Sequence, residues 1–159
     1  MKGPTDPIAR LLREHTDALI QLRQFQKAIR GLQEEGYNRR FARQINTALR
    51  FLDQEVRIHN RREEKALFPV LERYVEGPTR ILRDDHRRLR RRFAQLRSSF
   101  VHLEKHPDSF SAIRKLRLLA GEMNQMFVNH IHKENYILFP LVRRLLPKAE
   151  LREIAKKMM

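Results

Sequence analysis

Two stretches of this sequence repeat the same side chains at the same offsets. In each, a His is followed four residues later by a Glu, and six residues after the Glu comes the Pro of a Leu-Phe-Pro (His59, Glu63 and Pro69; His130, Glu134 and Pro140). Residues four apart on a helix lie on one face, so each stretch directs an imidazole and a carboxylate into the same space. Two such pairs facing each other predict a metal site.

The composition limits the chemistry of such a site. The chain has no cysteine, which excludes thiolate zinc sites, cysteine-ligated iron-sulfur clusters and cysteine catalysis. Any metal must therefore be held by nitrogen and oxygen. A mixture of imidazole and carboxylate suits iron, manganese or zinc and excludes a calcium-type oxygen cage.

The elements that must position these pairs are helices. Only five Gly and seven Pro interrupt the 159 residues, and apolar residues recur at steps of three and four, so we predict an all-α fold. Four amphipathic helices are expected over about residues 7–35, 39–75, 79–106 and 109–146, with a kink or break at Pro69. A short amphipathic helix over 147–158 is expected to pack across one end. We predict one domain over 1–159, with its core bundle at about 7–146 and the tail at 147–159.

Local signals define the ends of these helices. Asp6 followed by Pro reads as an N-cap, Gly36 fits the left-handed residue that ends a helix, and Asn38 and either Asp108 or Ser109 are candidate N-caps. In the fourth helix, the buried stripe is predicted to run through Phe127, His130, Glu134, Ile137, Leu138 and Leu141.

Two more histidines belong to the same pattern. A shift of 71 residues places His15 on His86 and His59 on His130, so the chain is predicted to be a duplicated helix pair. The four helices then form an antiparallel up-down-up-down bundle. His15 and His59 are equidistant from the predicted turn at 36–38, and His86 and His130 from that near 107, so all four histidines should lie in one layer.

This layer predicts a dinuclear metal site. A single His in an apolar stripe is more often a hydrogen-bonded core residue than a ligand, but buried carboxylates are costly unless they are paired or bind metal. We therefore predict a site of four imidazoles and two carboxylates: His15, His59, Glu63, His86, His130 and Glu134. One ion would take His15 and His59, the other His86 and His130, and both glutamates would bridge.

These residues resemble the hemerythrin-like, or HHE cation-binding, family. The resemblance covers about residues 8–146 and rests on a His in the first and third helices and on HxxxE with Leu-Phe-Pro in the second and fourth. It implies a non-haem di-iron centre with carboxylate and oxo or hydroxo bridges. It also implies a protein that binds oxygen, senses oxygen or iron, handles NO or peroxide, or repairs iron-sulfur proteins. Turnover of peroxide or O2 at the di-iron site is a further alternative.

One position departs from the oxygen carriers of that family. They have a fifth His one turn after the ligand of the third helix, where this chain has Arg90. The symmetric four-His site more closely resembles bacterial HHE proteins and iron-stress proteins, and the chain has no cysteine-bearing module of the repair type. We identify no catalytic residue beyond the ligands, so enzyme activity is left open.

The net charge of +15 suggests a second interpretation. Arginines crowd the third helix between its apolar positions: Arg80, Arg83, Arg87, Arg88, Arg90, Arg91, Arg92 and Arg97. The simpler interpretation is a solvated face; the alternative is a metal-stabilised binding module that docks an acidic or redox protein, nucleic acid or anionic lipid. A homodimer is also left open.

Some residues near the site are expected to stay outside it. His132 and Glu64 each lie about 100° around the helix from a ligand, so we expect a surface position for His132 and a solvated or outer-sphere role for Glu64. The sequence contains no stretch of about 20 apolar residues and no leader-like N-terminus, which predicts a soluble, cytoplasmic protein.

Overall fold

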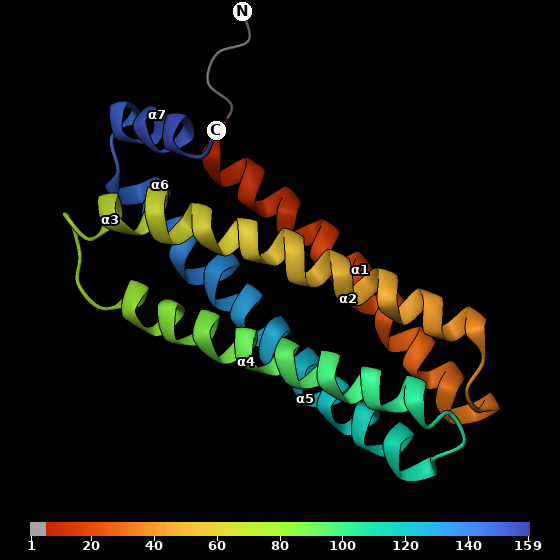
Figure 1. The fold of residues 1–159 in the computed structure, drawn as a ribbon. Helices are drawn as coiled ribbons and strands as arrows, with labels where there is room; N and C mark the ends of the chain where they lie inside the picture. Colours follow the sequence, from red (N-terminus) through yellow and green to blue (C-terminus); the bar gives the residue numbers. More distant parts are fainter. Residues whose placement is uncertain (1–5) are drawn as a thin grey trace, which may run out of the picture.

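The structure is a computed structural model that describes residues 6–159, and every regular element in that range is helical (Figure 1). Four long helices make up the body: α1 (Pro7–Glu35), α2 (Arg39–Arg62), α4 (Pro78–Lys105) and α5 (Phe110–Lys133). The helix α1 packs along α2 and along α5, and α4 packs along α5 and α2. The predicted all-α fold is confirmed, and the helices form a bundle.

The helix ends follow the signals in the sequence. The Asp6 carboxylate accepts hydrogen bonds from the backbone N–H groups of Ile8 and Ala9 at the start of α1. Gly36 ends this helix with a φ of +81°, which a residue with a Cβ rarely adopts. Asn38 and Ser109 cap α2 and α5 through their side-chain oxygens. Each of these four predictions is confirmed.

The helix is not broken at Pro69, and in both Leu-Phe-Pro stretches it passes through a π-turn before the proline. The helix α2 continues into a π-turn, η1 (Glu63–Leu67), and then α3 (Phe68–Leu71); α5 continues into η2 (Glu134–Leu138) and then α6 (Phe139–Leu145). The N–H of Phe68 bonds to the carbonyl of Glu63, five residues back, and Phe139 bonds in the same way to Glu134. The wider turn accommodates a proline, which has no N–H and crowds the carbonyl four residues before it.

Each π-turn adds one residue to the helical repeat and so changes which side chains face inward. In the fourth helix, Ile137 is 61% exposed and Leu141 only partly buried, whereas Phe139 and Val142 are buried. The predicted burial of Ile137 was therefore wrong, because a uniform period of 3.6 residues does not continue past Glu134. The second helix also ends earlier than predicted, at the Leu71 end of α3.

The hydrophobic core has two parts, one on each side of the histidine layer. One fills the bundle towards the turns at 36–38 and 106–109. The other lies at the opposite end, where α7 (Lys148–Lys157) crosses the bundle and contributes Ile154 and Met158 (Figure 1). None of the described helices is both long enough and apolar enough to span a bilayer.

Two helical glycines offer a matched test of packing in the bundle. A Cβ at Gly31 would overlap the ring of Phe41, whereas a Cβ at Gly121 meets nothing within 4 Å. We expect Gly121→Ala to raise the free energy of unfolding by up to about 1 kcal/mol through helix propensity. We expect Gly31→Ala to lower it by about 1–2 kcal/mol, because overpacking exceeds that gain. Urea unfolding of both variants tests the expected opposite signs, and equal effects would contradict this packing.

Candidate metal centre

Six polar side chains meet in the layer between the two parts of the core. Each long helix contributes one histidine, and each π-turn contributes its first residue, a glutamate. All six are buried, with exposures between 0 and 6%: His15, His59, Glu63, His86, His130 and Glu134. The structure therefore brings together all six residues that the sequence singled out.

On one side of the layer, His15 and His59 face each other across α1 and α2. Their Nε2 atoms lie 3.0 Å apart. The Nε2 of His59 lies 3.0 Å from Glu63 Oε1, and the Nε2 of His15 lies 3.4 Å from Glu134 Oε1. Each of these four residues offers one ligand atom, and the four atoms all lie within 4.8 Å of one another. This group is compact enough to hold a metal ion.

On the other side, His86 and His130 share the same two glutamates. The Nε2 of His86 lies 3.1 Å from Glu63 Oε2, and the Nε2 of His130 lies 2.6 Å from Glu134 Oε1. His86, His130 and the two glutamates form the second group of residues that is compact enough to hold a metal ion. The two oxygens of Glu63 thus approach histidines of different groups, which is the geometry of a bridging carboxylate.

Most of the atoms that point into the centre of this layer lack hydrogen bonds. Within the described residues, both oxygens of Glu63, both oxygens of Glu134 and the Nε2 atoms of His86 and His130 are buried without a hydrogen-bond partner. Unsatisfied buried polar groups cost free energy, and two buried carboxylates cost more. Cations bound at the two groups would satisfy these atoms, so the donor set fits metal.

The outer nitrogen of every histidine donates a hydrogen bond. The Nδ1–H groups of His59 and His130 donate to Glu14 Oε1 at 3.1 Å and to Asp85 Oδ2 at 3.2 Å. Those of His15 and His86 donate to Asn135 Oδ1 at 2.6 Å and to Glu64 Oε1 at 2.9 Å. These bonds fix the ring orientation and direct each Nε2 towards the centre of the layer.

An arginine and a lysine each form an ion pair with one of the carboxylates that bind the outer nitrogens of the histidines. Arg62 Nη1 lies 2.6 Å from Glu14 Oε2, and Lys133 Nζ lies 2.9 Å from Asp85 Oδ2. Both pairs, like the hydrogen bonds of the histidines, recur at residue numbers that differ by 71. Sequence reasoning missed Glu14 and Asp85, although each directly precedes a predicted ligand and the repeat marks them as a pair.

Aromatic rings cover two of the histidines. Phe139 stacks on His15 with the ring centroids 5.4 Å apart, and Phe68 stacks on His86 at 5.9 Å. Both phenylalanines come from a Leu-Phe-Pro stretch and follow a π-turn. The motif therefore places an apolar wall against one imidazole of each pair, which keeps water from that face.

The carboxylates control the charge of the histidines. Burial alone would lower the pKa of His59 and His130, but the charges of Glu63 and Glu134 and the hydrogen bonds to Glu14 and Asp85 raise both to about 10. Burial likewise would raise the pKa of Glu134, but His130 and its neighbours hold it well below the usual value. Without metal, these two histidines are therefore protonated at neutral pH.

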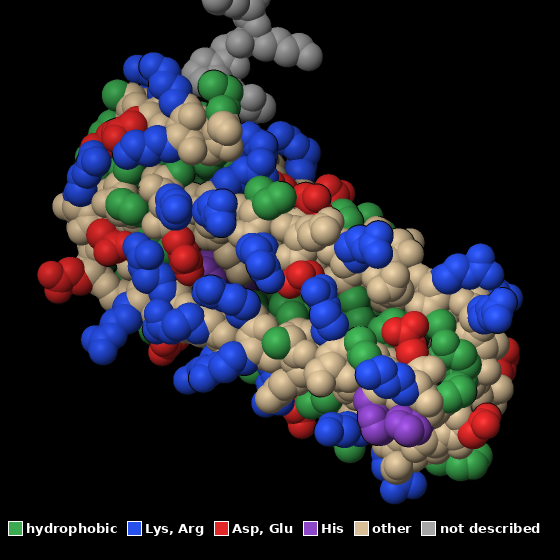
Figure 2. Space-filling model, in the orientation of Figure 1, with side chains coloured by type: hydrophobic (Ala, Val, Ile, Leu, Met, Phe, Trp, Pro, Cys, Tyr) green, Lys and Arg blue, Asp and Glu red, His purple; other side chains and the backbone are tan. Residues whose placement is uncertain are grey.

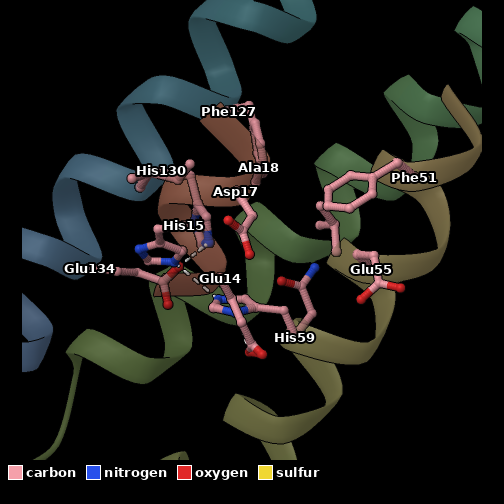
Figure 3. Close-up of a pocket in the computed structure, with 13 residues that line it drawn as sticks. Glu14, His15, Asp17, Ala18, Phe51, Glu55, His59, Phe127, His130 and Glu134 are labelled. Atoms are coloured by element: carbon pink, nitrogen blue, oxygen red, sulfur yellow. Dashed lines mark hydrogen bonds and ion pairs between the residues drawn. The ribbon is translucent and has the colours of Figure 1, made fainter. Parts of the chain in front are cut away.

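A small pocket leads to this layer between α1, α2 and α5 (Figure 3). His15, His59, His130 and Glu134 line its inner end, with Phe127 and Ala18 on its wall. Its volume of about 40 Å³ has room for about three water-sized molecules. The pocket therefore admits a very small ligand and is too small for a large substrate.

The residues expected to lie outside the site do so. His132 is exposed, and so is Tyr136, at 74%, against whose ring His132 lies. Glu64 contacts the outer nitrogen of His86 and belongs to neither of the two groups of residues that could hold a metal ion. Arg90 is exposed and lines a surface groove between α2 and α4.

Comparison with known proteins bears on this arrangement. A family model described as the hemerythrin HHE cation binding domain matches residues 6–154. No curated protein matches the chain. The family match covers nearly the whole chain and includes the six residues of the layer.

Proposed function

The chain belongs to the hemerythrin HHE cation-binding domain family, and on that premise we propose that its six buried ligands hold two iron ions. His15 and His59 would bind one ion, His86 and His130 the other, with Glu63 and Glu134 shared between them. The observation that carries the proposal is the set of buried carboxylate and imidazole atoms without hydrogen-bond partners, all directed to one centre. Manganese or zinc would fit the same donors.

The proposed activity is binding or sensing of O2, NO or peroxide in a redox or iron-stress response. Iron at this centre would supply the electrons and the open coordination positions that such ligands need. The protein would orient the imidazoles through Glu14, Asp85, Glu64 and Asn135 and would admit only small molecules through the pocket. The exposed Arg90, where oxygen carriers have a further His, argues against a reversible oxygen carrier.

Iron content and spectra test the metal proposal. Protein purified with iron available should hold about two irons per chain and show near-ultraviolet bands of a bridged ferric pair. The His59→Ala plus His130→Ala variant should lose both. The matched control is His102→Ala plus His106→Ala, since these two histidines are exposed and stack on each other away from the site. Wild-type protein without iron would end the proposal.

The physiological ligand requires a separate experiment. Anaerobic ferrous protein should be mixed in turn with O2, NO and peroxide, with spectra recorded after each addition. A ligand that enters through the pocket should bind more slowly when Ala18, on the pocket wall, is replaced by Leu. Rapid turnover of peroxide would favour an enzyme, and spectra unchanged by all three would contradict the sensing proposal.

Metal binding should release protons. The pKa values of His59 and His130 are raised to about 10, so both imidazoles carry a proton at pH 7 that a metal must displace. We expect iron or cobalt binding at pH 7 to release about two protons or more per chain, and affinity to rise with pH until these groups lose their protons. Calorimetry in buffers of different ionisation enthalpy measures the number of protons released per chain. Release of no protons would contradict the charge state described above.

We also propose an organisation for the whole chain. The recurrence of ligands, π-turns and outer hydrogen bonds at intervals of 71 residues supports a duplicated helix pair folded as an antiparallel up-down-up-down bundle. The contacts of Ile154 and Met158 with the second part of the core support one domain that includes the C-terminal helix. Cytoplasmic location and homodimer formation stay predictions from the sequence.

A second candidate function rests on the basic face. Lysines and arginines spread over the face that α2 and α4 present (Figure 2). Around the groove between these helices, Arg61, Lys65 and Arg90 have no carboxylate within 4.0 Å among residues 6–159. This unpaired charge would suit an acidic partner or a nucleic acid, and the module would then need its metal only for stability.

Salt-dependent binding tests this alternative. A short DNA duplex should bind at about 50 mM salt and dissociate as salt rises, with or without iron. The Arg61→Glu, Lys65→Glu, Arg90→Glu variant should lose the interaction. Three reversals on α5, Arg114→Glu, Lys115→Glu and Arg117→Glu, give a control with the same net charge. Absence of binding at low salt would count against a nucleic-acid partner.

A further inference from the structure

The outer hydrogen bonds of the four histidines match in pairs except at one position. Glu14 on His59 corresponds to Asp85 on His130, a carboxylate in both cases. Glu64 on His86 corresponds to Asn135 on His15. The second pair joins a carboxylate on one side to a neutral amide on the other, in otherwise equivalent places.

This difference concerns the charge of the groups that accept the outer hydrogen bonds of the histidines. Arg62 compensates Glu14 and Lys133 compensates Asp85, so these two carboxylates balance between the sides. Glu64 forms an ion pair with His86 alone, and no Lys or Arg of residues 6–159 lies within 4.0 Å of its carboxylate. The Glu64 carboxylate accepts the Nδ1–H of His86 at 2.9 Å, whereas the group in the corresponding place on His15 is the neutral amide of Asn135. Among the groups that accept the outer hydrogen bonds, the His86 side therefore has one more carboxylate than the His15 side.

The chemistry of metal ligands predicts which metal position this carboxylate strengthens. A carboxylate that accepts the Nδ1–H of a ligating histidine makes the imidazole a stronger donor, and loss of such a partner weakens metal binding by about 10–100-fold. An amide in the same place orients the ring but contributes no charge. The metal held by His86 and His130 should therefore be bound more strongly than the metal held by His15 and His59.

The pocket distinguishes the same two sides. Both His15 and His59 line it, whereas of the other pair only His130 does (Figure 3). Neither His86 nor Glu64 reaches the pocket, and Phe68 covers the ring of His86. The side whose histidine has the neutral amide partner is thus also the side open to small molecules.

Given the dinuclear centre proposed above, we propose that its two metal positions are inequivalent and that Glu64 and Asn135 set the difference. The position of His86 and His130 retains its metal more tightly. The position of His15 and His59 is the exchangeable one, and it meets ligands that enter through the pocket. Glu64 and Asn135 act as positioning residues, since each acts through the histidine that it contacts.

Competition with a chelator measures the difference on the loaded protein. Anaerobic protein holding two ferrous ions is equilibrated with increasing concentrations of a coloured ferrous chelator. Wild-type protein should lose its irons in two steps, with affinities that differ by about tenfold or more. Asn135→Glu should tighten the weaker step towards the stronger one, and Glu64→Asn should weaken the stronger step towards the weaker one.

Further variants assign the steps and control for damage to the fold. His15→Ala should abolish the weaker step and leave the stronger one. Gln125→Glu adds a carboxylate to an exposed position of α5 and should change neither step. General structural damage weakens both steps, so a tightened step in Asn135→Glu is an effect that damage does not produce. Circular dichroism confirms that each variant is folded.

The outcomes separate this proposal from the one it rests on. Two irons released with a single affinity, unchanged by Asn135→Glu and by Glu64→Asn, would overturn the inequivalence but leave the di-iron centre intact. Loss of the stronger step in His15→Ala would reverse the order and overturn it too. Wild-type protein that never holds two irons would instead contradict the di-iron centre itself.

Discussion

Replacing Glu63 by alanine should remove metal from both positions at once. Its Oε1 lies 3.0 Å from the Nε2 of His59 and its Oε2 lies 3.1 Å from the Nε2 of His86, so one substitution takes an oxygen from each group. The loss should exceed the roughly 100-fold upper effect of removing an outer-sphere partner. We expect elemental analysis of the purified variant to find almost no iron.

The same substitution should change how stability responds to iron. A ligand present at 100 times its dissociation constant stabilises the folded state by about 2.7 kcal/mol. For a chain of this length, that corresponds to a rise in Tm of about 5–10 °C. Wild-type protein should show this rise and Glu63→Ala should not. Glu104→Ala, which removes an exposed carboxylate from α4, should behave as wild type. Two irons retained in Glu63→Ala would contradict a shared ligand.

The position of the site could be predicted because it depends on simple helical geometry. Two histidines equidistant from a short turn lie at the same height, and Gly36 and Asn38 mark the first turn clearly. The Glu four residues after a His shares its face. These relations hold for any pair of regular helices, so the sequence alone was enough to bring six distant residues together.

The π-turns could not be predicted because they break that regularity. A proline inside a helical pattern indicates a disturbed helix, but its sequence does not say whether the chain kinks, stops or widens by one residue. In the structure the helix widens into a π-turn, and Ile137 points outward as a result. The side chains after Glu63 and Glu134 are therefore rotated around the helix axis relative to the positions that a regular α-helix would give them.

The outer hydrogen bonds of Glu14 and Asp85 were missed for another reason. Glu14 directly precedes His15 on its own helix, and a neighbour in sequence points about 100° away. It instead reaches across to His59 on α2, a contact that depends on how two helices are placed side by side. The repeat of the pattern at Asp85 and His130 was the available signal, and it would have identified both carboxylates.

Replacing Phe68 by alanine should strongly destabilise the fold. This ring is completely buried, stacks on His86 and lies under the guanidinium of Arg83 at 5.2 Å. Truncation of a buried phenylalanine costs about 3–5 kcal/mol. Phe110→Ala is the matched control, because that side chain is 86% exposed and should lose less than about 0.5 kcal/mol. Denaturant unfolding measures both variants.

The position of Phe68 links this loss of stability to the metal. Without the ring, the His86 imidazole keeps only its hydrogen bond to Glu64 and gains room to rotate away from Glu63. We therefore expect Phe68→Ala to weaken iron binding as well, and Phe68→Leu, which keeps most of the apolar volume, to weaken both properties less. A variant that unfolds at the wild-type denaturant concentration and keeps both irons would show that neither the stack nor the packing holds His86 in place.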